Sequence, residues 1–445
     1  MGKVNCTVRQ QVVSAIRKRC YPHTPRSYTG RGDQFVGMVG VAVGVAPGRT
    51  LVLAAFVFGG VVLGTASGLT PGLHANNFAL LLAGVAPAIP ADPLAVGTAM
   101  LAAGVVHTFL DIVPALALGV PDPAMAPTAL PGHRLVLQGR GREALRLSAL
   151  GSALAVAFAI PLAVPITLAM QRLYPTIAAN LTAVLGTVCL LLVGTEPTTR
   201  ARIGAAVAVT ASGLLGVLTL DIPTGGLVSA GGMLPGLFAG LFGAPILIEA
   251  VGGAGVPEQD DPRITTSRRF VVLVGLIGCV SGAVVGYLPG ISSAIAAAGA
   301  LVLVPYRGPR AFVVATSGVN TANTIFALFA LVALGSPRTG VLVALESANV
   351  PHNLPVLLGT VAVAAGAGFV LVLAVGDRYL AAVGSIDNAR LSVAVLGFLS
   401  VLVFLFTGVV GVGVFVVATA VGLVPVQFGA RRMSLMGVLL VPLAL

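Results

Sequence analysis

Long apolar runs, separated by short breaks of Pro, Gly and charged residues, make up most of this chain. In the first half these runs cover about 35–46, 51–67, 73–89, 94–119, 147–170, 178–194, 202–220 and 226–250. They resume near 270–288, 291–304, 311–335, 353–375, 391–409, 410–428 and 433–445. A helix that crosses a membrane needs about 20 mostly apolar residues, and the alternation of membrane β-strands is absent from these runs. The pattern predicts an all-α polytopic membrane protein.

Composition and charge agree with this class. Of the 445 residues, 57% are hydrophobic and only 9% are charged, too few to cover a soluble domain. The formal net charge is +11, but the basic residues gather in 1–34 and in short loops, as membrane topology requires. We therefore expect the lipid bilayer as a partner, and no nucleic acid. Residues 1–34 are interpreted as a basic cytoplasmic tail, with a chain start near Met38 or upstream as the alternative.

A polar linker at 251–269 separates a first membrane half, 35–250, from a second, 270–445. The two halves resemble each other in sequence. The stretch 64–74, with Pro-Gly near its end, reappears as 282–292. Further along, His107-Thr108 and Asn323-Thr324 occupy matching positions, and each is followed by Leu-Gly-x-Pro. Two matched segments in the same order indicate an internal repeat, whose first copy begins near residue 51.

Loop charges predict that the two copies have opposite orientations in the membrane. After the first Pro-Gly hairpin the loop holds only Asp92, whereas the equivalent loop of the second copy holds Arg307 and Arg310. One span later the order reverses, because 134–146 is rich in arginine and its counterpart has only Arg338. Since basic loops stay in the cytoplasm, each copy is predicted to be one Pro-Gly-broken hairpin plus about five transmembrane helices. Inverted repeats of this kind are typical of secondary transporters.

The two Pro-Gly breaks are the predicted solute site. A helix that begins after a break directs unpaired N–H groups and a partial positive charge toward it, which favours an anionic ligand. Helix N-capping by the Ser and Asn side chains is the structural alternative, and the two roles are compatible. The candidate ligand-contacting residues at the breaks are Thr70, Pro71, Gly72, His74, Asn76, Asn77, Pro289, Gly290, Ser292 and Ser293.

Polar residues inside the span 94–119 form a second group of candidates. His107 and Asp111 are four residues apart, so they share a helical face with Thr108 beside them. An intramembrane acid is costly and usually serves ion coupling, proton relay or substrate contact. A purely structural His–Asp pair is the alternative. In the second copy the matching face offers neutral oxygen-bearing side chains that suit sodium, although such residues also join helices. They are Asn320, Thr321, Asn323 and Thr324.

The longest motifs place the chain near a known family. Residues 68–76, 107–114 and 130–144, with 287–291 and 317–320, resemble the large permease subunit of tripartite tricarboxylate transporters, in an archaeal-type branch of uncharacterised function. The resemblance implies prokaryotic uptake of a carboxylate such as citrate across the cytoplasmic membrane, driven by sodium or protons. It also implies a small membrane subunit and an extracytoplasmic binding protein as partners.

The chain also departs from the pattern of this family. Thr316 and Ser317 stand where tricarboxylate members usually carry an acid, and Pro131 stands in place of an Asp. The substrate and the coupling ion therefore stay open between these alternatives.

A channel and an intramembrane enzyme are the rival classes. The sequence has no His-Glu-x-x-His motif and no Gly-x-Ser-x-Gly motif, and we predict no catalytic residue, cofactor or resident metal. A channel could share broken helices and inverted repeats with a carrier. Saturable, gradient-dependent flux would distinguish the two.

Overall fold

The computed structural model describes residues 46–71, 73, 75–119, 126–227, 232–251, 256–260, 262–288, 293–302 and 308–445. Every regular element in these ranges is a helix, which confirms the predicted all-α polytopic class. The basic tail and the first predicted run, 35–46, lie outside the described residues except for residue 46. Eight of the described helices are long and apolar enough to cross a membrane.

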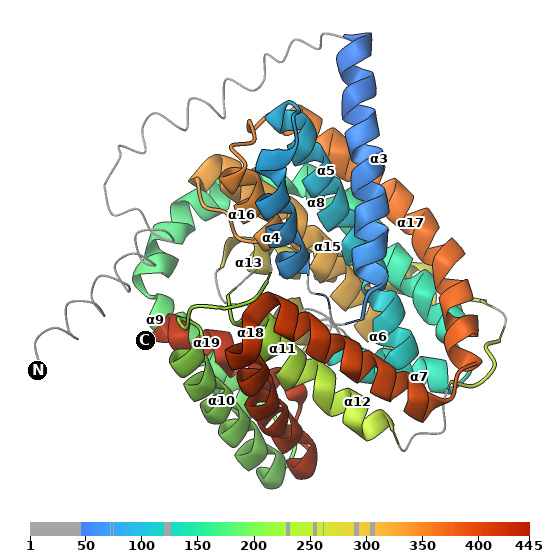
Figure 1. Ribbon diagram of the computed structural model, residues 1–445, viewed down its shortest axis with the longest axis vertical. Helices are drawn as coiled ribbons and strands as arrows, with labels where there is room; N and C mark the ends of the chain where they lie inside the picture. The colour runs from blue at the N-terminus through green and yellow to red at the C-terminus, as the bar shows by residue number, and fades with distance from the viewer. Residues whose placement is uncertain are drawn as a thin grey trace, which may run out of the picture.

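The helices follow the predicted runs except at 126–137 and 340–347, where no apolar run was predicted (Figure 1). Those of the first half are α3 (Pro47–Leu69), α4 (Ala75–Val85), the short η3 (Ala86–Ala88), α5 (Pro93–Leu110), α6 (Ile112–Leu118), α7 (Ala126–Leu137), α8 (Gly141–Ala179), α9 (Leu181–Gly194), α10 (Thr199–Thr219), α11 (Leu234–Phe238), the π-helical η4 (Ala239–Gly243) and α12 (Ala244–Ala250). Those of the second half are α13 (Arg268–Tyr287), α14 (Ser293–Val302), α15 (Pro309–Leu334), α16 (Gly340–Ser347), α17 (Leu354–Gly384), α18 (Asn388–Phe428), the short η5 (Arg432–Met436) and α19 (Gly437–Ala444).

Local sequence explains where the central helices begin and end. Pro93 opens α5 behind Asp92, whose side chain accepts a hydrogen bond from the Leu94 N–H at 3.0 Å. Proline suits a first helical turn because its missing N–H would have no partner there. The Leu-Gly-x-Pro motifs end the equivalent helices, since Gly119 has φ 68° and Gly335 has φ 60°. Only glycine adopts this left-handed conformation without strain. The repeated Leu-Gly-x-Pro motif therefore ends a helix in each half of the chain.

Three helices differ from the predicted runs in extent. The runs 147–170 and 353–375 belong to α8 and α17, which extend to 39 and 31 residues. Helix α8 continues through three prolines that the sequence pattern treats as punctuation. The predicted boundary between 391–409 and 410–428 corresponds to a kink in α18, where Gly408 has φ 71° and ψ −166°.

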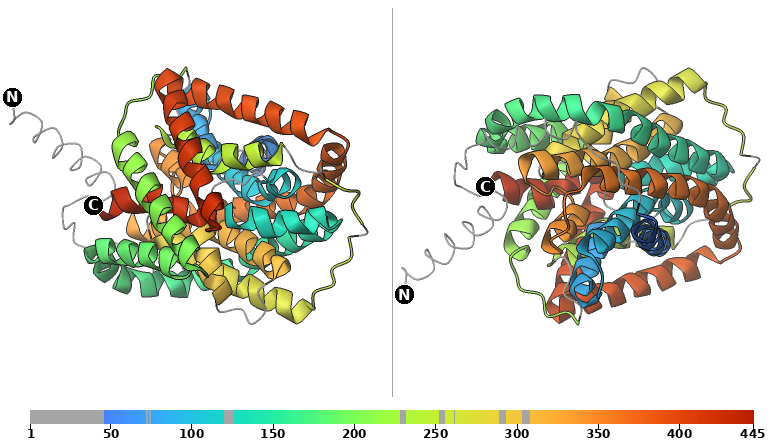
Figure 2. Two further views of the ribbon diagram at one scale, coloured as in Figure 1. Left: turned by 90° about the horizontal axis from the view of Figure 1, so that it is seen from below. Right: turned by 90° about the horizontal axis from the view of Figure 1, so that it is seen from above.

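The helices pack as two bundles (Figure 2). The core bundle comprises α3 to α8 and α13 to α17, around a hydrophobic core that includes Phe109, Leu145 and Phe326. This core continues into the side bundle through Ile246 and Leu247 of α12 and through Val395 and Leu399 of α18. The side bundle comprises α9 to α12, α18, η5 and α19, with a second core that includes Phe242 and Leu435. Each half of the sequence therefore contributes its first helices to the core bundle and its last helices to the side bundle.

Equivalent helices make equivalent contacts in both bundles. The pair α3 and α5 corresponds to α13 and α15, and the pair α8 and α15 corresponds to α17 and α5. In the side bundle, α10 packs on α19 as α18 packs on α12. Close approach in the first pairs needs the predicted glycines, because Gly64 lies against the backbone of Ala103 and Gly282 against the Ala322 side chain. The contacts follow the sequence repeat.

The first helices of the two halves begin at opposite ends of the core bundle. Arg49 pairs with Asp92 at 3.1 Å where α3 and α5 begin. Arg310 pairs with Glu143 at 2.9 Å where α15 and α8 begin, and Thr265 just before α13 bonds the same carboxylate. Helix α17 spans the distance between these ends, because its start lies near the start of α5 and its later turns pack on the start of α8. This geometry supports the inverted relation, which stays a prediction.

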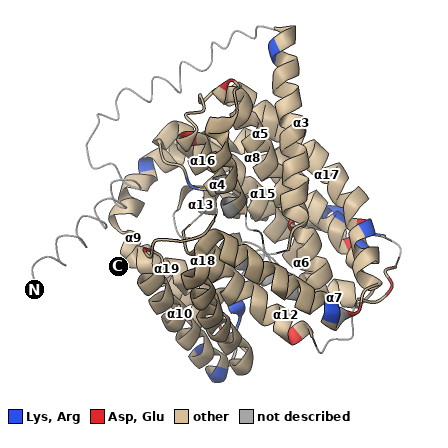
Figure 3. Ribbon diagram, viewed as in Figure 1, with Lys and Arg blue, Asp and Glu red and all other residues tan. Residues whose placement is uncertain are grey.

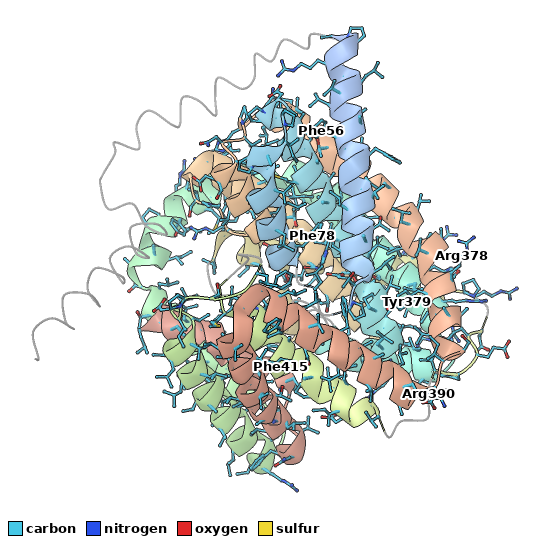
Figure 4. The ribbon with its side chains drawn as sticks, viewed as in Figure 1. Phe56, Phe78, Arg378, Tyr379, Arg390 and Phe415 are labelled. Atoms are coloured by element: carbon cyan, nitrogen blue, oxygen red, sulfur yellow. The ribbon has the colours of Figure 1, made fainter. Side chains whose placement is uncertain are left out.

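Charge is concentrated at one end of the molecule (Figure 3). Arg146 and Asp377 form a two-bonded pair there at 3.0 and 2.8 Å. Arg378 and Arg390 lie at the same end, where α17 gives way to α18 (Figure 4). Outer helices instead expose apolar side chains, such as Phe58 at 70%. The distribution fits a protein whose sides face lipid and whose ends face water.

Candidate functional site

The structure describes part of the predicted site. Thr70 and Pro71 follow α3 at the first break, and α4 begins at Ala75, so Asn76 and Asn77 fall in its first turn. Ser293 begins α14 after the second break and is 3% exposed. Gly72, His74, Pro289, Gly290 and Ser292 lie outside the described residues, as do the side chains of Asn76 and Asn77. The role of the breaks in binding therefore stays a prediction.

His107 of α5 is fully buried where α5 packs against α3. Its Nδ1 is 2.9 Å from the Ser67 hydroxyl oxygen, and both residues are at most 2% exposed. Ser67 stands one position before Gly68, whose lack of a side chain lets α3 approach α5 at His107 and Leu110. Sequence reasoning missed Ser67, although it belongs to the repeated segment at the first break. The bond fixes the imidazole close to the end of α3, and thus close to the break.

Asp111 connects the two halves of the chain. The Asn320 side-chain amide donates to Asp111 Oδ2 at 2.7 Å, and the two residues are 4% and 6% exposed. Asp111 stands between α5 and α6, and its own N–H donates to the His107 carbonyl. The sequence leaves open a purely structural role for Asp111, as the partner of His107. The structure adds a partner from the other half, so candidate residues from both copies of the repeat meet in the core bundle.

A row of buried hydroxyl groups continues from this contact across α5, α15 and α8. Thr108 Oγ1 is 3.5 Å from Thr321 Oγ1, which donates to the Ser152 hydroxyl at 2.9 Å. Ser152 donates to the Ser317 carbonyl at 3.3 Å, and the Ser317 hydroxyl is 2.8 Å from that of Ser148. The row joins three helices by hydrogen bonds inside an apolar bundle, where unpaired polar groups would be costly.

Sequence reasoning found Thr108 and Thr321 of this row and did not place Ser148, Ser152 and Ser317 in it. Ser148 and Ser152 are four residues apart, as are Ser317 and Thr321, so each pair lies on one helical face. That spacing was the available signal. It could not reveal which helices would face each other.

The other candidates of α15 lie near the second hairpin. Thr324 is 6% exposed, and the Asn323 side-chain oxygen is buried with no hydrogen-bond partner. The backbone of Asn323 packs against α13 at Gly286. At the end of α13, the buried Tyr287 hydroxyl bonds to Thr167 of α8. The segment that leads into the second break is thereby anchored to α8.

Two further acids are buried at the charged end of the molecule. Glu143 is 1% exposed and bonds Arg310 at 3.0 and 2.9 Å, Arg140 at 2.8 Å, and Thr265. Glu196 is also 1% exposed and pairs with Arg431 at 3.2 Å. Each acid lies near a helix end beside a guanidinium group. Among the described residues, no group of His, Cys, Asp and Glu could hold a metal ion.

Comparison with known proteins identifies the family. Residues 54–437, most of the chain, match the tripartite tricarboxylate transporter TctA family. The chain belongs to this family. An uncharacterized protein of Methanocaldococcus jannaschii is 24% identical over 342 residues, which is 76% of this chain and 85% of the relative. No solved structure matches the fold.

Membership of the TctA family confirms the predicted resemblance and makes the chain a permease component of a transporter. It is a multi-pass membrane protein, and its family is a transporter family. TctA-family permeases generally form part of tripartite transporters, with a small subunit and a binding protein.

Proposed function

We propose that this TctA-family permease is a secondary active transporter that moves a small, tricarboxylate-like carboxylate together with sodium ions or protons. It acts in the cytoplasmic membrane with its N-terminus in the cytoplasm. The observation that carries the proposal is the buried contact between Asp111 and Asn320, where matched elements of the two halves meet.

The chemistry of this contact suits ion coupling. A carboxylate inside a membrane domain is expensive unless a cation or a proton neutralises it. Asn320 is a neutral amide, so its hydrogen bond orients the Asp111 carboxylate without cancelling the negative charge. A proton or a sodium ion that binds to this carboxylate would change its charge and its contact with Asn320. The ion would then act where the two halves meet, as coupling to a conformational change requires.

The solute carboxylate is assigned to the two Pro-Gly breaks. Helices α4 and α14 begin directly after the breaks, and their first N–H groups supply donors and a partial positive charge. His107 lies next to the end of α3 through Ser67. Ion and solute would therefore bind close together within the core bundle, which is a simple physical basis for coupling.

Alternating access would come from movement between the core bundle and the side bundle. The hydroxyl row ties α5, α8 and α15 together, so the core bundle is suited to move as one unit. The chain passes between the two bundles at Asn180 between α8 and α9, in the linker between α12 and α13, and at 385–387 between α17 and α18. Connections of this kind can absorb changes in backbone angle.

The decisive experiment is uptake of labelled citrate and a panel of mono- and dicarboxylates into proteoliposomes of the purified chain. Sodium and proton gradients are imposed separately, and a small membrane subunit and a binding protein are added in parallel reactions. Saturable uptake that requires one gradient supports the carrier and identifies its ion. Non-saturating flux that only follows the solute gradient would contradict the proposal and indicate a channel.

A further inference from the structure

Arg338 lies in the connection between α15 and α16 and is not one of the candidate residues at the two breaks. Its guanidinium carbon is 4.9 Å from the centre of the Tyr174 ring of α8. Helix α15 begins at the charged end of the molecule, at Arg310, so its far end and Arg338 lie toward the opposite end. In the predicted topology that end faces the outside of the cell.

The edge of the Arg338 side chain is buried without acceptors. Nε and Nη2 are both inaccessible to solvent, and neither has a hydrogen-bond partner. The neighbouring Thr339 hydroxyl is also buried and unpaired, and it makes no capping bond to α16. Within the part of the chain that the structure describes, no carboxylate forms a salt bridge with Arg338. Three buried polar groups on two adjacent residues therefore have no hydrogen-bond partner.

Burial makes this arrangement informative. An unpaired neutral donor in a protein interior is destabilising, and an unpaired charged donor is more so. Native proteins almost always provide such groups with a partner. Nε and Nη2 lie on the same edge of the guanidinium plane and present two parallel N–H bonds, which is the geometry that a carboxylate accepts. The guanidinium group packs over the face of the Tyr174 ring, and this contact fixes its orientation.

The position of the edge relates it to both hairpins. Tyr174 follows Thr167 by seven residues on α8, a rise of about 10 Å. Thr167 bonds Tyr287, the last residue of α13 before the second break. Helix α16, which begins directly after Thr339, packs against α4 of the first hairpin. Arg338 therefore leads into a helix that packs on the first hairpin, and its ring partner Tyr174 lies two turns along α8 from the residue that anchors the second.

We propose that Arg338 and Thr339 bind a carboxylate group of the transported solute on the outer side of the two hairpins. This inference rests on the proposed function, because it takes the solute to be a carboxylate. Arg338 supplies two parallel hydrogen bonds and the positive charge, and Thr339 supplies a hydroxyl. A solute with several carboxylates could engage this pair and a hairpin together, which would favour it over a monocarboxylate.

The test compares three variants of the purified full chain. Arg338→Gln removes the charge and the two-bonded edge, and Arg338→Lys keeps the charge alone. Arg172→Gln is the control, because Arg172 is exposed on α8 near Tyr174. Binding of citrate, a monocarboxylate and inorganic phosphate is measured in detergent by calorimetry, and the KM of uptake is measured in proteoliposomes. Thermal melting confirms that each variant is folded.

We expect Arg338→Gln to weaken citrate binding and raise KM by about tenfold or more, the effect of losing charge-assisted hydrogen bonds. Arg338→Lys should recover only part of this loss, and Arg172→Gln should bind citrate like the wild type. Unchanged citrate binding in a folded Arg338→Gln protein would overturn the inference. Arg338-dependent binding of phosphate without citrate would overturn it too, since the ligand would then be a phosphate group.

The binding measurement separates this inference from the proposed function. Citrate binding that depends on Arg338, in a protein that shows no gradient-driven uptake, would support the site and count against the transporter proposal. Gradient-driven uptake whose KM is unchanged in the Arg338→Gln protein would support the transporter proposal and contradict the proposed carboxylate site.

Discussion

Asp111 and Glu143 are both buried acids of the core bundle, yet their surroundings differ completely. Glu143 is 1% exposed and lies in the first turn of α8, with Arg140 and Arg310 beside it. Asp111 is 4% exposed, and its identified side-chain partner is the neutral amide of Asn320. The comparison shows that burial alone does not indicate a functional acid. The arginines beside Glu143 make it part of a structural ion-pair cluster, whereas the bond to Asn320 places Asp111 where the two halves of the chain meet, and an ion bound there could act on both halves.

The largest expected effect comes from Asp111→Asn. The substitution keeps the shape of the side chain but removes the charge that a driving ion would neutralise. Gradient-driven uptake should fall to the level of empty liposomes, while the melting temperature in detergent stays near that of the wild type. Glu143→Gln is the matched control and should retain its ion dependence. Full uptake by the Asp111→Asn protein would remove the role assigned to this acid.

Glu143→Gln should instead affect stability. Breaking a buried ion pair is strongly destabilising, but Arg140 and Arg310 are 27% and 32% exposed and keep access to water. We expect a loss of about 2 kcal/mol in the free energy of unfolding, seen as a lower melting temperature. A double-mutant cycle with Arg310→Gln tests the assignment. Additive losses in the cycle would show that the two side chains do not interact.

Asn320→Ala should have an intermediate effect, which we expect on the ion dependence assigned to Asp111. The hydrogen bond at 2.7 Å orients the carboxylate, and a bond to a charged group contributes about 1.5–3 kcal/mol. Without it, the ion concentration for half-maximal uptake should rise by roughly tenfold. Uptake is measured against sodium concentration and against pH, and the Glu143→Gln protein serves as the control. An unchanged ion dependence would show that Asn320 only joins helices.

Ser152→Ala should have the smallest effect. Ser152 connects Thr321 to the Ser317 carbonyl inside the hydroxyl row. Its removal should lower the free energy of unfolding by about 1 kcal/mol, as for a typical buried hydrogen bond, and should leave the ion dependence unchanged. Thermal melting and uptake are measured on the same preparation. A shift in ion dependence would extend the ion site along the row.

Much of the fold could be predicted from the sequence because membrane helices are marked by local composition. The Leu-Gly-x-Pro motifs, for example, place the ends of α6 and α15 at Gly119 and Gly335. Proline was a poorer guide, because α8 continues through Pro161, Pro165 and Pro175. A helix packed in a bundle can tolerate prolines when neighbouring groups satisfy the freed carbonyls.

The site was predictable in its residues but not in its pairings. Burial of His107 and Asp111 followed from their place in an apolar run. Their partners Ser67 and Asn320 are distant in sequence, and only tertiary packing determines which faces of α3 and α15 meet α5. The sequence indicates only a loop charge at Arg338, because the contact of its guanidinium group with Tyr174 depends on where α8 ends.

The most direct test of the account is the accumulation of labelled solute in proteoliposomes that contain the wild-type, Asp111→Asn or Glu143→Gln chain, under an imposed sodium or proton gradient. The account predicts that the wild type and Glu143→Gln concentrate a carboxylate above its external level, and that Asp111→Asn does not. Equal accumulation by all three proteins, or dependence on Glu143 in place of Asp111, would contradict it.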